Sequence, residues 1–123
     1  MVATFGLTRP GLLVRLEGGA MFLAAVAFYW AIAGPWWAFA AAFLLPDLAI
    51  LAYLGSPRMG AIVYNLVHTL LGPLALVVIA AALAAREPGL VALVWIAHIG
   101  LDRLLGFGLK YPEGFKPTHL GRI

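Results

Sequence analysis

The chain has 123 residues, of which 64% are hydrophobic and 11% charged, and its mean hydropathy is +1.02. A soluble domain carries about 25% charged residues, and a globule of this length has too little interior to bury so much apolar surface. These values exclude an ordinary soluble domain, a nucleic-acid-binding protein and a disordered chain. They predict an all-α, multi-pass membrane protein that contacts the lipid bilayer and carries no cysteine chemistry.

Four apolar segments follow one another along the chain. No charged residue lies between Glu17 and Asp47, a stretch much longer than the roughly 20 residues that one span needs. Gly34-Pro35 divides this stretch, because glycine ends helices and proline begins them. Two further turns, at 55–58 and 86–89, separate the remaining segments. The predicted single transmembrane domain has spans at about 11–33, 36–54, 59–85 and 89–109, and then a cytoplasmic tail, 110–123.

The short connections and the positive charges predict how these spans are arranged. Short connections favour antiparallel neighbours and therefore an integral membrane four-helix bundle. Arg86 alone lies at one end of this bundle, and the other Lys and Arg residues lie at the opposite end. Because cytoplasmic loops are rich in Lys and Arg, we expect both termini in the cytoplasm and a multi-pass location in the cell membrane. The residues at the basic end are Arg9, Arg15, Arg58, Arg103, Lys110, Lys116 and Arg122.

Ionisable residues inside the spans occupy one layer of the predicted bundle. An Asp at the centre of a membrane costs about 2.5–3.5 kcal/mol on insertion scales, so each such residue needs a partner or a purpose. At about 1.5 Å per residue, all of them lie roughly 9–15 Å inside the cytoplasmic boundary. Unrelated residues would be scattered over the membrane thickness, so the layer predicts one polar site. Its members are Glu17, Asp47, His68, His98 and Asp102.

Helical spacing supports this polar site. His98 and Asp102 are four residues apart and share one face of the last span, as Tyr64 and His68 do in the third. Pro46 precedes Asp47 within the second span. A proline there leaves a carbonyl without its helical donor, and the resulting kink would direct Asp47 into the bundle.

Carboxylates and imidazoles at one depth suit zinc, manganese or iron as a divalent metal cofactor. We expect Asp47, His68, His98 and Asp102 to be the metal ligands. The predicted activity is a metal-dependent hydrolase or transferase acting on a lipid-linked substrate, with water activated by the metal. Glu17, Asp47 and His98 are the candidate catalytic residues, Glu17 as the base. The other polar residues of this site are Arg15, Tyr64, Asn65, Arg103, Lys110 and His119.

Several other functions fit the same residues. The charged groups would also neutralise one another and fix the register of the helices without chemistry. A small chain with little mass outside the membrane also suits a non-catalytic accessory subunit of a larger membrane complex. His68 and His98 at matched depth would also serve as axial ligands of a b-type haem. A proton or ion pathway is a further alternative, and a narrow bundle would need to form a homo-oligomer for it.

Two long strings resemble a known family. They are PDLAILAYLGSPRMGAIVYNLVHT and WIAHIGLDRLLGFGLKYPEGFKPTHLGRI, and RLEGG near the start accompanies them. Together they resemble the bacterial domain-of-unknown-function family 4260, which implies a small four-helix integral membrane protein. The pairs Pro46-Asp47 and His68-Thr69 are also similar to motifs of small membrane-bound metal-dependent hydrolases, although the longer histidine-rich strings of those proteins are absent here.

Overall fold

The computed structural model describes residues 10–106 and contains four helical segments long and apolar enough to cross a membrane. These segments are Pro10–Ala31, Trp36–Leu54, Pro57–Leu83 and Arg86–Leu105. Every regular element in the described part of the chain is a helix. The prediction of an all-α membrane protein with four helices is confirmed.

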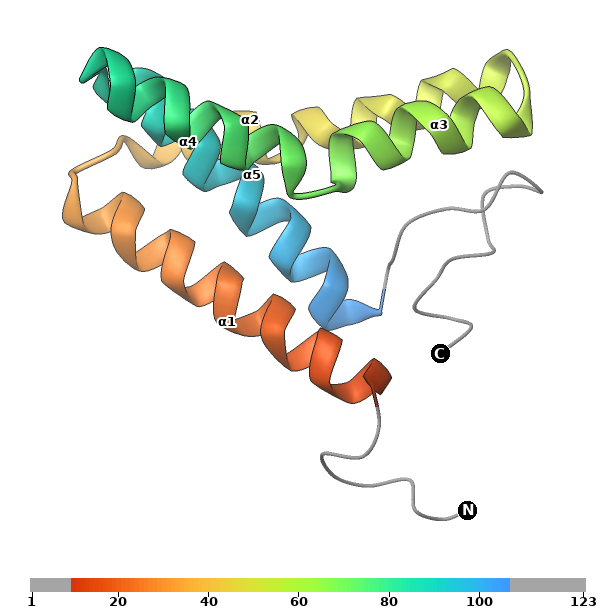
Figure 1. Cartoon of the computed structure of the whole chain (residues 1–123), viewed down its shortest axis with the longest axis horizontal. Helices are drawn as coiled ribbons and strands as arrows, with labels where there is room; N and C mark the ends of the chain where they lie inside the picture. Colours follow the sequence, from red (N-terminus) through yellow and green to blue (C-terminus); the bar gives the residue numbers. More distant parts are fainter. Residues whose placement is uncertain (1–9, 107–123) are drawn as a thin grey trace.

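The first and last spans are unbroken helices that lie side by side (Figure 1). They are α1 (Pro10–Ala31) and α5 (Arg86–Leu105). Their close approach depends on two glycines, because a Cβ added to Gly18 would lie 2.6 Å from the carbonyl oxygen of Gly100, and a Cβ on Gly100 would lie 2.6 Å from that of Gly18. Small residues allow transmembrane helices to pack backbone against backbone. The α1–α5 pair therefore forms the framework of the bundle.

The second span changes its helical geometry at Pro46. It begins as α2 (Trp36–Phe43) and continues as the 3-10 helix η2 (Leu45–Leu54). Proline has no N–H to donate, and the amide of the next residue, Asp47, bonds to the carbonyl of Leu44 at 3.2 Å. A bond to the carbonyl three residues earlier is typical of a 3-10 helix, whereas an α-helix bonds four residues back. The carbonyl of Phe43 consequently loses its usual helical donor.

The third span is interrupted near its middle. It consists of α3 (Pro57–His68) and α4 (Leu71–Leu83), so the predicted segment 59–85 is two helices. Thr69 is extended, with φ −90° and ψ 152°, and Pro73 offers no N–H to the Thr69 carbonyl. Irregular backbone inside a membrane is tolerated where protein covers it or where it lines a cavity. The break in this span therefore marks a position for a site.

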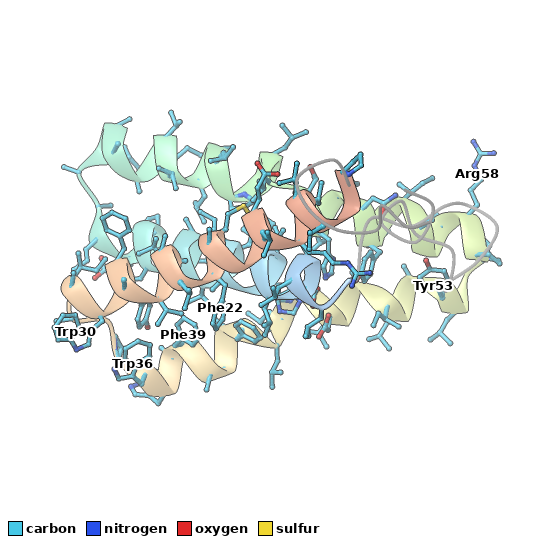
Figure 2. The ribbon with its side chains drawn as sticks, turned by 90° about the horizontal axis from the view of Figure 1, so that it is seen from below. Phe22, Trp30, Trp36, Phe39, Tyr53 and Arg58 are labelled. Atoms are coloured by element: carbon cyan, nitrogen blue, oxygen red, sulfur yellow. The ribbon has the colours of Figure 1, made fainter. Side chains whose placement is uncertain are left out.

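The helix α5 lies at the centre of the described structure and contacts α1, α2 and α4. The η2 and α3 segments pack against each other and extend together away from the other helices, as Figures 1 and 2 show. Large apolar side chains cover the outside, for example Trp37, Leu54 and Leu71, which are 77%, 88% and 75% exposed. Such a surface is stable in lipid and not in water.

Aromatic and basic side chains hold the helices together at the end of the bundle where α5 begins. The buried ring of Tyr29 packs with Leu90 and Val94, and its hydroxyl donates to the carbonyl of Pro35 at 2.6 Å. Arg86 donates to the carbonyls of Ile32 and Ala33, the two residues after the end of α1, at 2.7 and 2.8 Å. Carbonyls at a helix end have no partner within the helix, and these bonds supply one. They join the first and last spans at the end of α5 opposite His98 and Asp102.

Candidate metal site

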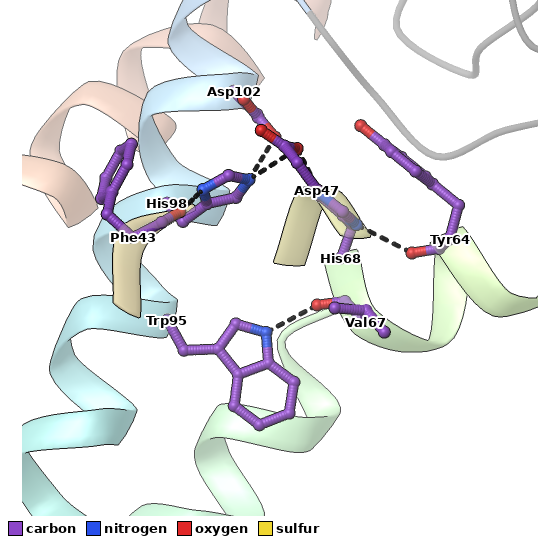
Figure 3. A network of polar contacts seen from close by, with 8 residues as sticks. All are labelled: Phe43, Asp47, Tyr64, Val67, His68, Trp95, His98 and Asp102. Carbon is purple, nitrogen blue, oxygen red and sulfur yellow. Dashed lines mark hydrogen bonds and ion pairs between the residues drawn. The ribbon is translucent and has the colours of Figure 1, made fainter. Parts of the chain in front are cut away.

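Four of the five predicted ionisable residues meet in one cluster, which we call the His/Asp cluster (Figure 3). It consists of Asp47, His68, His98 and Asp102, and one ligand atom from each lies within 4.8 Å of the others. Asp47 stands at the start of η2, His68 is the last residue of α3, and the other two lie one turn apart on α5. The cluster therefore joins three spans at the points where two of them are broken.

Four nitrogen–oxygen distances in the cluster are similar to the distances between the ligands of a tetrahedral metal ion. The Nε2 atom of His98 lies 3.2 Å from Asp47 Oδ1 and 3.2 Å from Asp102 Oδ2. The Nε2 atom of His68 lies 3.6 and 3.5 Å from the same two oxygens. Zinc binds nitrogen and oxygen ligands at about 2.0–2.2 Å, so tetrahedral ligands stand about 3.3 Å from one another. The four nitrogen–oxygen distances centre on this value.

A backbone carbonyl fixes the orientation of the His98 ring. The Nδ1 atom of His98 lies 2.5 Å from the carbonyl oxygen of Phe43, and a carbonyl accepts but does not donate. The proton must therefore be on Nδ1. Phe43 is available because the change of geometry at Pro46 takes its helical donor away. The local structure of the second span thus orients His98 on the last span.

His68 is oriented in the same manner from its own helix. Its Nδ1 atom donates to the carbonyl oxygen of Tyr64 at 2.9 Å, and the Tyr64 ring stacks on the imidazole with centroids 3.7 Å apart. A neutral imidazole protonated at Nδ1 presents a lone pair at Nε2. Metal-binding histidines usually donate their other N–H to a carbonyl or carboxylate, as both histidines do here.

With this orientation both Nε2 atoms face carboxylate oxygens, and His98 Nε2 lies at hydrogen-bond distance, 3.2 Å, from Asp47 Oδ1. Among the residues that the structure describes, neither His68 Nε2 nor Asp102 Oδ2 has a hydrogen-bond partner, although both atoms are buried. A buried polar atom without a partner costs about 1–3 kcal/mol. A cation bound among the four atoms would satisfy them all at once. Protonated imidazoles are the other means of satisfying them.

The cluster is buried on its histidine side and accessible on its carboxylate side. His68 and His98 are 4% and 2% exposed, whereas Asp102 is 20% and Asp47 is 49% exposed. A metal site needs such an entry path for the ion and for any substrate. In the described structure, access to the cluster is at Asp47.

Trp95 connects the broken third span to α5 beneath the cluster. Its indole N–H donates to the carbonyl oxygen of Val67 at 2.6 Å, directly before His68 (Figure 3). The ring fits because Gly72 has no side chain, since a Cβ there would lie 2.5 Å from Trp95 Cη2. The sequence carries one signal for this arrangement, the Gly72-Pro73 pair, since both residues interrupt helices. The continuous span predicted for 59–85 did not take it into account.

The remaining predicted site residues lie outside the cluster. Glu17 is exposed on α1, and the structure does not bring it to the two histidines. It interacts electrostatically with Arg103, which packs where α1 and α5 touch at Gly18. Arg15 is exposed, and its guanidinium lies against Gly106 after the end of α5. These three residues form a separate polar group.

Tyr64 is the neighbour that stacks on His68, and Asn65 is partly buried beside it on α3. Lys110 and His119 lie outside the described residues. In the described part of the chain, backbone carbonyls and Tyr64 thus contribute to the surroundings of the two histidines.

Comparison with known proteins gives one match. The family model described as "Domain of unknown function (DUF4260)" matches residues 11–123. No curated protein and no solved structure matches the chain. The similarity to membrane-bound metal-dependent hydrolases therefore receives no support from these comparisons.

Proposed function

Since the chain belongs to the domain-of-unknown-function family 4260, whose description names no activity, we propose a function from the His/Asp cluster itself. The protein is a membrane metalloprotein that holds one divalent transition-metal ion, zinc in the first place. The ligands are Asp47, His68, His98 and Asp102. The observation that carries this proposal is that both Nε2 atoms face two carboxylate oxygens at 3.2–3.6 Å while both Nδ1 atoms bond to carbonyls.

The main competitor is a network of ion pairs without a metal. It requires a proton between each Nε2 atom and a carboxylate, carried by the nitrogen or by the oxygen. For His98 this proton has a place, because Nε2 lies at hydrogen-bond distance, 3.2 Å, from Asp47 Oδ1. For His68 no acceptor in the described residues has hydrogen-bond geometry, although two carboxylates are close. A metal ion needs only the distances, and these suit tetrahedral coordination. The cluster is therefore better explained by a metal ion than by protons.

A haem between the two histidines fits the cluster poorly. Asp47 and Asp102 each place an oxygen within 3.6 Å of both Nε2 atoms. These oxygens occupy the space that a porphyrin plane between two axial ligands would need. We therefore do not develop the haem alternative.

The proposed activity is hydrolysis or group transfer on a lipid-linked substrate. A bound divalent ion polarises a carbonyl or phosphoryl oxygen and activates water at neutral pH. A substrate would reach the metal ion past Asp47, which is exposed. The two buried histidines would keep bulk water away from the opposite side of the ion. The proposed orientation has both termini in the cytoplasm, which places the cluster in the cytoplasmic half of the membrane.

Metal analysis of purified protein tests this proposal. We expect about one zinc per chain after gentle detergent extraction or zinc titration, and a more than about 100-fold loss of affinity in Asp102→Asn, because removal of a ligand exceeds the 10–100-fold effect of its supporting groups. Glu87→Gln is the matched control, since it removes an exposed carboxylate from the first turn of the same helix. A folded wild-type protein that holds no stoichiometric metal and gains none on titration would overturn the proposal.

A further inference from the structure

An apolar pocket of about 250 Å³ lies beside the His/Asp cluster. Its volume is slightly below the roughly 300–1,000 Å³ of pockets that hold whole small molecules, so it suits a segment of a longer ligand. The one polar atom that its side chains offer, the indole nitrogen of Trp95, already donates to Val67. The pocket therefore offers nothing to a polar ligand. Its lining residues are Ala42, Leu45, Pro46, Val67, Val91 and Trp95.

The pocket and the cluster share their walls. Pro46 lines the pocket and Asp47 follows it in the cluster, and Val67 is related in the same way to His68. Trp95 lies about one helical turn before His98 on α5. Each of the three spans that supply the cluster therefore also supplies a pocket residue, which is either adjacent in sequence to the cluster residue or one helical turn from it. A molecule seated in the pocket would have one end next to the cluster.

The order of these residues along α5 gives the pocket a direction. Val91 comes first, then Trp95, and then the ligands His98 and Asp102 near the last residue, Leu105. At about 1.5 Å per residue, Val91 is roughly 10 Å farther from that end than His98, and Asp102 is roughly 5 Å from it. The cluster therefore lies closer to that end of the span than the pocket does, and the pocket extends from it toward the membrane centre.

A lipid in the leaflet at that end has the same order of parts. Its polar linkage lies at the boundary, and its acyl chains extend toward the membrane centre. The pocket also opens to the lipid-facing surface, since Leu45 and Val91 are 59% and 49% exposed. A hydrocarbon chain can thus enter sideways from the bilayer.

We propose that this pocket seats one acyl chain of a membrane lipid and thereby presents the ester or phosphoester linkage of that lipid to the His/Asp cluster. This inference rests on the proposed metal site and names its substrate class. The wall formed by Trp95 and Val67 keeps the chain in register with His68, because the indole N–H bonds to the backbone directly before that ligand.

Photo-crosslinking tests the proposal on the full chain. The zinc-loaded protein is placed in vesicles of phosphatidylethanolamine and phosphatidylglycerol that contain a phosphatidylethanolamine with a diazirine in one acyl chain. We expect labelling concentrated on the pocket residues, and Val67→Trp to lower it by about tenfold or more, because the indole would occupy space that the acyl chain needs. Val78→Trp is the matched control, since Val78 is 67% exposed on α4 and does not line this pocket.

Zinc content is measured on every sample, so that the two proposals can fail separately. If the protein holds zinc but the label is spread evenly over all lipid-facing helices, the acyl-chain proposal is overturned and the metal site stands. If the wild-type protein is labelled at the pocket but holds no zinc, the metal site is overturned. The proposal that the pocket presents a lipid linkage to that site is then overturned with it. Crosslinking of the pocket to a second copy of the chain, in place of lipid, would also overturn it.

Discussion

His98 and Phe43 are 55 residues apart in the sequence, yet His98 Nδ1 donates to the Phe43 carbonyl at 2.5 Å. The carbonyl is free because the amide of Asp47 bonds to Leu44, one residue closer than an α-helix requires. One change of backbone geometry therefore has two effects. It places Asp47 beside the histidines, and it provides the acceptor that orients one of them.

Pro46→Ala should weaken metal binding while preserving the fold. The alanine supplies an N–H and favours α-helical geometry, so that the Asp47 amide can return to the Phe43 carbonyl and compete with His98. Loss of a hydrogen bond that orients a metal-binding histidine typically costs 10–100-fold in affinity, and we expect about that loss for zinc. Zinc titration and a thermal unfolding curve measure the two effects. Pro57→Ala, at the first residue of α3, should change neither greatly.

Zinc affinity should decrease as the pH is lowered. Both Nε2 atoms must be unprotonated to bind the ion, because both Nδ1 atoms already carry protons for Tyr64 and Phe43. At acidic pH each imidazole gains a proton that the metal must displace. Competitive chelator titrations over a pH series measure this dependence, which should become shallower by about one proton in His68→Ala. An affinity that does not depend on pH would exclude imidazole ligands.

Gly100→Ala should destabilise the bundle. The new Cβ would lie 2.6 Å from the Gly18 carbonyl oxygen and 2.8 Å from the Phe22 amide nitrogen, both of them backbone atoms. Overfilling of a packed contact typically costs about 1–3 kcal/mol, and we expect a lower melting temperature in detergent. Gly89→Ala on the same helix is the control, since its Cβ would lie 3.8 Å from the nearest atom, in Ala80. That variant should be as stable as the wild type or more so, because alanine is the better helix former.

Trp95→Phe should loosen the break in the third span. It removes the indole donor and leaves the Val67 carbonyl without its 2.6 Å partner, at a cost of about 1–3 kcal/mol if no other donor replaces it. We expect a lower melting temperature together with weaker zinc binding, since His68 follows Val67. Trp37→Phe is the matched control, because Trp37 is 77% exposed to lipid. Equal melting temperatures for both variants would contradict the role assigned to the Trp95–Val67 bond.

The sequence predicted how deep the ionisable residues lie in the membrane better than the side of each helix that they face. Charge-free segments determine how far each residue lies inside a span, and Asp47, His68, His98 and Asp102 do meet in one cluster. Glu17 has a similar depth but lies outside it, because depth does not determine how a helix is rotated about its axis. The rotation of α1 is set by the contact of its Gly18 with Gly100, which requires the packed structure.

Backbone geometry was the other part that the sequence predicted incompletely. Pro46 indicated a free carbonyl in the second span, but the acceptor of His98 is the carbonyl of Phe43 and not the one four residues before the proline. The third span looked continuous because its break lies within a long apolar run. Hydropathy reports the environment of a segment, and it does not report whether the helix inside it is continuous.

The distribution of the cluster over three spans determines when it can form during synthesis. Asp47 and His68 enter the membrane before the last span, which carries His98 and Asp102, has been made. Until then Asp47 must be inserted at a cost of about 2.5–3.5 kcal/mol, which the surrounding leucine and isoleucine residues offset at about 0.3–0.6 kcal/mol each. Only a chain translated through α5 has the complete set of four side chains. Under the proposed function, metal loading would therefore be a late step of biogenesis, and we expect a chain truncated before α5 to insert but to retain no ion.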